Sequence, residues 1–397
     1  MILSLELYRS LSRYLAARAL GNHLPGSLAG PVAPLRLVNR EEPELPAAGW
    51  ARVRPLLSGI CGSDLATLSG KSSLYLTPLV SLPFVPGHEI IGRLLDDVDG
   101  LAAGQRVVLD PVLSCVTRGL DPCRWCAQGA TSRCDRITFG HLSPGLQTGY
   151  CADTGGGWSR MLIAHRAQLH PVPDGVPDER AVLAEPLACA VHAVRRAHLA
   201  PGESVLVVGA GAVGLLTLLA LRDLAQAGDV TVVAKHPRQA DLARLLGATD
   251  VVTPDRTAKA LRRATRAFLL SPERGTDYLL GGADVAFDCT GSRSGVDLAL
   301  RTVRAGGKVV LAGMPAQGAD LTPLWYRELQ LIGAYASSHG DGDGGDFAAA
   351  LRLVASAPLD GMVGAVYPLA AWREALDHAF SAGRLGTVKV AFAPGMD

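Results

Sequence analysis

Short apolar runs alternate with amphipathic segments through the second half of the chain. The first run, residues 205–208, has the length and the branched side chains of a buried strand, and a Leu-rich segment of helical character follows it. Further apolar runs come at residues 230–233, 284–287, 308–312 and 329–332. Because strands that alternate with helices assemble into parallel sheets, this pattern predicts a doubly wound α/β domain.

A glycine-rich turn, Gly209-Ala-Gly211-Ala212-Val213-Gly214, joins the first of these strands to its helix. Gly209 permits the tight turn, Gly211 lets a pyrophosphate approach the backbone, and Gly214 lets the helix pack closely on the strand. The backbone N–H groups at the helix start, at Ala212 and Val213, would face the phosphates. The next apolar run follows about 20 residues later, where a second strand ends beside the adenosine ribose. The turn therefore predicts dinucleotide binding.

The first half of the chain has a different pattern. Between residues 35 and 60, short apolar runs alternate with Pro43, Pro46, Gly49 and Pro55, which predicts strands and turns rather than helices. From residue 347 onward a helix and short strands are expected. Residues 253–282 are longer than a plain connection and locally basic, which predicts a solvated helical face.

The N-terminal residues carry Leu3, Leu7, Leu11 and Leu15 at helical spacing. Charged side chains interrupt any secretory segment, at Glu6, Arg9, Arg13 and Arg18. An extension that packs on its own domain is favoured over the alternative, an amphipathic membrane anchor.

Composition narrows the class of protein. The 397 residues are 48% apolar, enough for the cores of two domains of ordinary size. The formal charge of +1 comes with scattered basic residues, so neither a nucleic-acid partner nor a membrane partner is expected. The eight cysteines, several of them clustered, indicate metal ligands in a reducing compartment, and a cytoplasmic protein is expected.

Two motifs in the β-rich region carry candidate chemistry. Cys61 comes just before Ser63 and Asp64, and His88 and Glu89 follow Gly87. A lone Cys or His is usually a core residue. Together, however, a thiolate and an imidazole suit zinc, and a catalytic zinc needs only three protein ligands and an open position.

A second set of cysteines, Cys115, Cys123, Cys126 and Cys134, lies farther along the chain. Four thiolates can close a tetrahedral structural zinc site that holds together a lobe with little core of its own. The alternative is three structural thiols left by a site that no longer binds metal.

These motifs resemble the zinc-dependent medium-chain alcohol dehydrogenase family, in its polyol and sugar dehydrogenase branch. The resemblance rests on residues 61–64, on Gly87-His88-Glu89, on Glu185-Pro186-Leu187 and on the glycine turn, and it spans roughly residues 35–395. It implies a Rossmann domain, residues 188–338, inserted into a mostly β, GroES-like catalytic domain made of residues 1–187 and 339–397.

The resemblance also implies roles for individual residues. The zinc would be surrounded by Cys61, His88, Glu89 and Glu185, with the choice of the directly ligating glutamate left open. Ser63 matches the family's relay hydroxyl, and Asp64 matches the carboxylate that orients the His ligand.

The sequence departs from the family in two places. Many relatives carry a proton-relaying histidine shortly after the serine, where this chain has Leu65-Ala66-Thr67, so the cofactor ribose or water would have to substitute. Cys115 lies five residues upstream of the usual cysteine position, which requires the segment after it to loop out. The resemblance also implies that Trp158 lies at the border of the substrate cleft. A buried position in the core is an equally good interpretation of this tryptophan.

Cofactor choice is predicted from the end of the second strand. An NAD enzyme has Asp or Glu there, but this chain has Ala234 followed by Lys235, His236 and Arg238. Two cations and a titratable donor favour the 2′-phosphate of NADP over NAD. The alternative is a solvated basic turn that never touches the ribose. Thr290 and Gly313 follow later strands at the sheet edge where such ligands bind.

The sequence thus predicts a zinc-dependent oxidoreductase that transfers a hydride between a nicotinamide cofactor and an alcohol or carbonyl substrate, and that forms a homodimer or homotetramer. A zinc-free quinone or enone reductase of the same superfamily and a non-catalytic dinucleotide-binding protein are the alternatives.

Overall fold

The computed structural model describes residues 1–20, 32–315, 318–340 and 345–396. The chain divides into two compact units. A discontinuous unit comprises Met1–Glu185 and Ser337–Asp397, and a central unit comprises Pro186–Ala336.

The central unit contains a six-stranded sheet in the order β10-β9-β8-β13-β14-β15. All its neighbouring strands are parallel, as the alternating pattern predicted. The strands are β8 (Val205–Val208), β9 (Val230–Val233), β10 (Asp250–Val252), β13 (Ala283–Asp288), β14 (Val303–Leu311) and β15 (Gln330–Gly333). The predicted doubly wound Rossmann architecture is confirmed.

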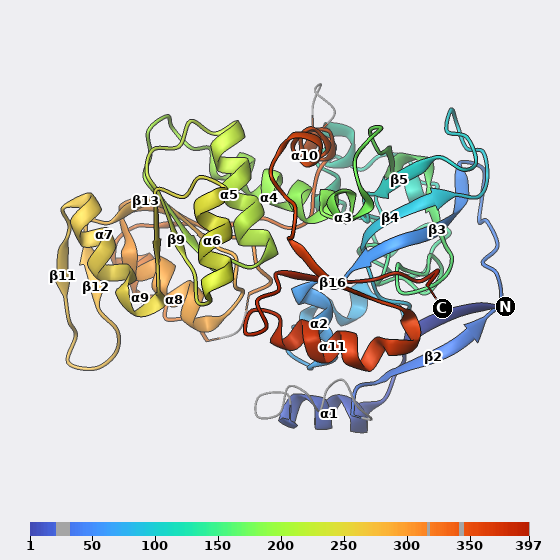
Figure 1. Ribbon diagram of the computed structural model, residues 1–397, viewed down its shortest axis with the longest axis horizontal. Coiled ribbons are helices and arrows are strands. Elements are labelled where there is room, and N and C mark those ends of the chain that lie inside the picture. Colours follow the sequence, from blue (N-terminus) through green and yellow to red (C-terminus); the bar gives the residue numbers. More distant parts are fainter. Residues whose placement is uncertain (21–31, 316–317, 341–344, 397) are drawn as a thin grey trace. The chain divides into compact units, whose positions relative to one another are not determined.

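Helices flank this sheet (Figure 1), and their apolar faces pack on strand residues such as Leu206, Ala286 and Val309. They are α4 (Ala184–Ala197), α5 (Ala212–Leu224), α6 (Pro237–Leu245), α7 (Thr257–Thr265), α8 (Arg293–Thr302) and α9 (Thr322–Tyr326), with the 3₁₀ turn η7 (Pro254–Arg256). In α5, the run from Gly214 to Leu221 is buried, which explains its nearly uniform apolar composition.

The basic segment 253–282 is only partly the predicted helical face. Helix α7 carries Arg262 and Arg263, both exposed, but a separate antiparallel hairpin follows it, formed by β11 (Phe268–Leu270) and β12 (Tyr278–Leu280). Three-residue strands are too short for an alternating pattern to be visible in the sequence, and the hairpin was therefore not predicted.

The discontinuous unit is built on a mostly antiparallel sheet in the order β16-β17-β3-β4-β5-β7, with β6 also paired to β3. Its strands are β3 (Trp50–Gly59), β4 (Glu89–Leu94), β5 (Arg106–Leu109), β6 (Leu162–His165), β7 (Leu169–Pro171), β16 (Val363–Tyr367) and β17 (Lys389–Phe392). The C-terminal strand β17 pairs directly with β3, so both ends of the chain contribute to one sheet.

Helices and 3₁₀ turns complete this unit. The helices are α2 (Gly62–Leu68), α3 (Asp178–Ala181), α10 (Gly345–Ser356) and α11 (Trp372–Ser381); the 3₁₀ turns are η2 (Leu74–Leu79), η3 (Val116–Arg118), η4 (Cys126–Gln128), η5 (Thr131–Arg133), η6 (Arg166–Gln168) and η8 (Leu369–Ala371). Trp158 is fully buried in the core with Phe84 and Phe392, so it is a core residue and does not line a cleft.

The N-terminal extension is helical in only part of the range where the spacing of its leucines predicted a helix. Residues Ile2–Leu7 form strand β1, which pairs antiparallel with β2 (Leu35–Arg40), and only Leu11–Leu20 form a helix, α1. Leu5 and Leu7 join the core of the discontinuous unit, as expected for an extension that packs on its own domain. Within the described ranges, none of the helices combines the length and the apolar character needed to cross a membrane.

Candidate active site

Two neighbouring strands bring the candidate zinc ligands together. Cys61 follows β3 as the N-cap of α2, and His88 precedes β4, whose first residue is Glu89. Because β3 and β4 are antiparallel and Gly59 is the register partner of Glu89, the end of one strand faces the start of the other. Gly87 has a φ of +94°, and a Cβ there would collide with the Trp158 ring, so the turn into His88 requires glycine.

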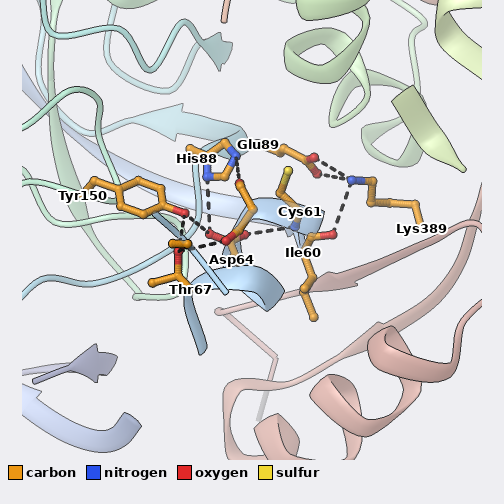
Figure 2. Close-up of polar contacts among 10 residues, drawn as sticks. Ile60, Cys61, Asp64, Thr67, His88, Glu89, Tyr150 and Lys389 are labelled. Carbon is orange, nitrogen blue, oxygen red and sulfur yellow. Dashed lines mark hydrogen bonds and ion pairs between the residues drawn. The ribbon is translucent and has the colours of Figure 1, made fainter. Parts of the chain in front are cut away.

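A thiolate, an imidazole and a carboxylate converge at this point. The ligand atoms of Cys61, His88 and Glu89 all lie within 4.8 Å of one another, and we call these three residues the mixed-donor site. His88 and Glu89 are buried, whereas Cys61 is partly exposed. Borderline-soft and oxygen donors with one side accessible match a zinc site that keeps a position for substrate. Figure 2 shows the three side chains side by side, with the Glu89 carboxylate directed at Lys389.

Ser63 and Asp64 each lie close to one of the two ring nitrogens of His88. Ser63 Oγ lies 3.5 Å from Nε2, and Asp64 Oδ1 lies 3.5 Å from Nδ1. Asp64 is itself fixed, since its Oδ2 accepts a hydrogen bond of 3.0 Å from the Cys61 backbone N–H. Burial lowers the pKa of His88, but the charges of Asp64 and Cys61 outweigh it and raise this pKa well above its usual value.

A buried lysine that the sequence did not reveal holds Glu89. Lys389 Nζ lies 2.6 Å from each oxygen of the Glu89 carboxylate and 3.4 Å from the carbonyl oxygen of Ile60. Burial lowers the pKa of Lys389, but Glu89 and Cys61 raise it above its usual value. Because Lys389 starts strand β17 and lies 300 residues from Glu89, only the pairing of β17 with β3 brings the two together.

Glu185 has a different position from the other predicted ligands. It lies in the first turn of α4 and is buried, and its charge also raises the pKa of Lys389. In the part of the chain that the structure describes, it is not a member of the three-residue ligand group.

Hydroxyl groups surround Thr67, in the stretch where the family resemblance led us to expect a relay histidine that this chain lacks. Thr67 Oγ1 lies 2.9 Å from Ser72 Oγ and 3.4 Å from the Tyr150 hydroxyl, and it donates to the Ser63 carbonyl oxygen at 2.9 Å. The Tyr150 hydroxyl donates to Asp64 Oδ1 at 3.5 Å (Figure 2). Burial raises the pKa of Tyr150, so this phenol remains protonated and acts as a donor.

The second set of cysteines also assembles. Cys115, Cys123, Cys126 and Cys134 lie with their sulfur atoms within 4.8 Å of one another, and we call them the four-cysteine site. Cys115 reaches the group because the chain after it turns back through η3, leaving its Sγ 3.6 Å from that of Cys134. Four thiol donors and no open position fit a structural zinc.

The backbone around the four-cysteine site already favours thiolate at one position. Burial raises the pKa of Cys123, but hydrogen bonds from backbone N–H groups outweigh it and lower this pKa to about 6. Burial raises the pKa of Cys134 to about 11, so in the absence of metal this thiol is protonated. Only a cation would hold all of the sulfurs as thiolates.

Arg118 organises the surrounding lobe and was missed from the sequence. Its side chain is fully buried and donates to the backbone carbonyl oxygens of Leu113, Phe139, Leu142, Ser143 and Gly145. These residues form loops in which carbonyl groups have no strand partner, and one guanidinium satisfies several of them. Nothing in the local spacing distinguishes this arginine from an exposed one.

The glycine turn has the geometry of a phosphate-binding loop. Gly209 has a φ of +98°, and a Cβ on Gly214 would collide with the Gly209 carbonyl oxygen, so both positions need glycine. A Cβ on Gly211 would meet nothing within 4 Å, which leaves space for a ligand against the backbone. Ala212 and Val213 begin α5, so their N–H groups point into that space.

The other predicted cofactor residues lie at the carboxyl edge of the same sheet. Ala234 directly follows β9 and is buried, His236 caps α6, and Lys235 and Arg238 are exposed beside it. Thr290 follows β13 and lies against Gly209, and Gly313 follows β14 and lies against Gly291. The carboxyl edge of a parallel sheet is where a dinucleotide binds.

Comparisons with known proteins agree with this geometry. The family model described as zinc-binding dehydrogenase matches residues 212–356, and the one described as alcohol dehydrogenase GroES-like domain matches residues 47–174. The chain is 32% identical to L-idonate 5-dehydrogenase of Vitis vinifera over 289 residues, 72% of each chain. It is 33% identical to sorbitol dehydrogenase of Arabidopsis thaliana over 299 residues, 73% of this chain and 75% of the relative.

Among solved structures, a zinc-binding dehydrogenase of Sinorhizobium meliloti 1021 bound to NADP superimposes with a TM-score of 0.69 and 26% identity, covering 91% of this chain and 95% of that one. The chain belongs to the zinc-dependent medium-chain alcohol dehydrogenase family, in its polyol dehydrogenase branch. It is a zinc-dependent oxidoreductase that uses a nicotinamide cofactor and acts on small alcohols; the two alternatives considered from the sequence find no support in these relatives.

Proposed function

We propose that the mixed-donor site holds the catalytic zinc of a dehydrogenase for polyols or sugar-derived alcohols that prefers NADP. The convergence of Cys61, His88 and Glu89 beside the Ser63 hydroxyl is the observation that carries the proposal. The relatives named for idonate and sorbitol support the substrate class. Residues 188–338 would bind the cofactor, and residues 1–187 and 339–397 would form the catalytic domain.

The side chains of the mixed-donor site and its neighbours have separate roles around the substrate oxygen. A zinc ion held by these residues would supply Lewis-acid polarisation of that oxygen, and a bound nicotinamide would exchange hydride with the carbon. Cys61 and His88 supply permanent metal donors, and Asp64 fixes the orientation of the His88 ring. Lys389 holds the Glu89 carboxylate in place and compensates part of the negative charge of the site.

Ser63 would take the proton of the substrate alcohol, and its side chain is within hydrogen-bonding reach of the Tyr150 hydroxyl. From there, the hydroxyl groups of Tyr150, Thr67 and Ser72 offer a path toward the surface, because Ser72 is partly exposed. This path replaces the histidine that many relatives have, and hydroxyl groups can pass a proton by donating one hydrogen bond while accepting another.

The preference for NADP rests on the turn after β9. No carboxylate directly follows this strand to accept the ribose hydroxyls and repel a phosphate; Ala234 takes that position and is followed by the exposed Lys235 and Arg238. A guanidinium can bind a phosphate through two hydrogen bonds. Each hydrogen bond to a charged group contributes roughly 1.5–3 kcal/mol, so Arg238→Ala should weaken NADP binding about ten- to hundredfold.

One set of assays tests substrate and cofactor together. The zinc-loaded enzyme is screened against sugar alcohols, aldonates and simple aliphatic alcohols with NAD and with NADP, and formation of the reduced cofactor is followed by its absorbance. The proposal expects the highest kcat/KM with a polyol or aldonate and NADP. The double variant Ala234→Asp with Arg238→Ala should reverse the cofactor order, through added repulsion and lost attraction. A higher kcat/KM with NAD in the unmodified enzyme would refute the NADP preference.

We further infer self-association through the central unit and a reducing, cytoplasmic location. β15 is an edge strand, and Trp325 and Tyr326, which precede it, are 81% and 68% exposed. A second copy that added its own β15 would cover this edge and these rings, because an uncovered apolar edge invites pairing. Light scattering should give a dimer or tetramer, and a monomeric mass would refute this inference. The free thiols of the structure support the location.

A further inference from the structure

A cleft with a cationic rim lies on the discontinuous unit, and its lining includes no residue of the mixed-donor site or the four-cysteine site. It is lined by residues of the N-terminal extension and of α11, chiefly Tyr8, Arg13, Leu35, Arg36, Trp372 and Arg373. Its volume is about 460 Å³, which falls in the range of roughly 300–1,000 Å³ for small-molecule sites. Figure 1 shows α1, β2 and α11 as neighbouring elements.

The rim carries three guanidinium groups, and no Asp or Glu is among the described residues that line it. Arg36 is held by Glu6 just outside the cleft, with its Nη2 2.6 Å from Glu6 Oε1. Arg373 has no carboxylate within ion-pair distance over the ranges that the structure describes. Glu6 compensates the charge of Arg36, but positive charge remains in excess at the rim, and a bound anion would lower the repulsion that is left.

Aromatic rings hold these guanidinium groups. The Cζ atom of Arg36 lies 4.8 Å from the centroid of the Tyr8 ring, and that of Arg13 lies 6.0 Å from the same centroid. Arg373 Cζ lies 4.3 Å from the Trp372 ring, which is nearly buried. A guanidinium stacked on a ring loses less conformational entropy when it binds a ligand, so the rim is partly preorganised.

We propose that this cleft is a binding site for a small phosphate monoester, separate from the dinucleotide site. A phosphate monoester carries about −1.5 to −2 charges at neutral pH and three acceptor oxygens, which suit several guanidinium groups converging from different elements. The apolar floor formed by Leu35 and Trp372 would contact the organic part of the ligand.

Isothermal titration of the zinc-loaded full chain with glucose 6-phosphate, without nicotinamide cofactor, tests the proposal. One binding event is expected in the unmodified protein, and Arg373→Ala should weaken it about tenfold or more, the effect of losing a charge-assisted hydrogen bond. Arg13→Gln should also weaken it. Arg373 is exposed, so the variant should unfold at the parental temperature; Arg13→Gln provides a second measurement if it does not.

Two control variants test whether the ligand binds at this cleft or elsewhere on the protein. Arg384→Ala removes an exposed arginine shortly after the end of α11 and should leave binding unchanged. Arg238→Ala alters the predicted cofactor turn and should also leave it unchanged. No binding in the unmodified protein would overturn the proposal, as would binding lost in Arg238→Ala but kept in Arg373→Ala. Equal affinity for glucose or for malate would overturn the assignment to a phosphate monoester.

Discussion

The mixed-donor site and the four-cysteine site both gather thiols, but their surroundings differ. The mixed-donor site lies between the end of strand β3 and the start of strand β4. Side chains hold its donors in place: Asp64 contacts His88, and Lys389 contacts Glu89. The four-cysteine site lies among short 3₁₀ turns, and its lobe is held by backbone hydrogen bonds to Arg118 and by the cysteines themselves.

This difference indicates which site depends on metal for its shape. The strands beneath the mixed-donor site have a core of apolar residues such as Ile90 and Leu94, so the site should keep its geometry without metal. Among the residues that the structure describes, the apolar cluster around the four cysteines adds Leu120, Trp125 and Ile137 to the cysteines, and these three are partly exposed. Folding of that lobe should therefore be coupled to zinc binding.

The largest expected effect comes from Cys126→Ser. Structural zinc in small domains contributes on the order of 10 kcal/mol of binding free energy, and much of it is local folding free energy. We expect the loss of one zinc per chain and rapid hydrogen exchange over residues 115–145, measured by elemental analysis and mass spectrometry. Cys289→Ser, which changes a cysteine of the central unit outside both sites, is the control. Unchanged exchange in the lobe would contradict the coupling.

Cys61→Ser should give the next largest effect, on turnover rather than on folding. Lewis-acid polarisation is worth several kcal/mol, so its loss should lower kcat about a thousandfold or more. The zinc content should fall by one per chain while the thermal unfolding curve stays close to that of the parent. Full activity in this variant would exclude the mixed-donor site as the catalytic centre, and Cys151→Ser, which changes a cysteine outside the mixed-donor site, serves as the reference.

Lys389→Met tests whether charged side chains, rather than metal alone, hold the mixed-donor site. Removing one partner of a buried ion pair leaves the other uncompensated and typically costs about 3–5 kcal/mol. Urea unfolding should show this loss, and adding Glu89→Gln should recover part of it, because the uncompensated carboxylate is then absent. If the double variant is as unstable as the sum of the single variants, the two side chains are not coupled.

Ser63→Ala should have the smallest of the four effects. A positioned proton relay contributes roughly a hundredfold to turnover, and the hydroxyl holds no metal in this arrangement. Zinc content and cofactor affinity should remain at the parental values while kcat falls. Ser73→Ala, which changes a nearby hydroxyl outside the path, is the matched control. Equal kcat and an equal pH profile in Ser63→Ala would show that the proton leaves by another route.

Local signals in the sequence determined much of the architecture. The alternation of apolar runs predicted the parallel sheet of the central unit, because strand and helix periods are visible within a few residues. The glycine turn and the cysteine and histidine motifs were also readable, since each requires particular residue types at short spacing.

Contacts between distant segments were decided only by the tertiary structure. Lys389 meets Glu89 because β17 pairs with β3, and Arg118 meets five carbonyl groups because loops close around it. Leu3 and Leu7 share helical spacing with Leu11 and Leu15, but Leu3, Leu5 and Leu7 also alternate as in a strand, and pairing with β2, which buries Leu5 and Leu7, decides for the strand. In each case the deciding free energy comes from burial and pairing with residues far away in the chain, which a local pattern alone does not determine.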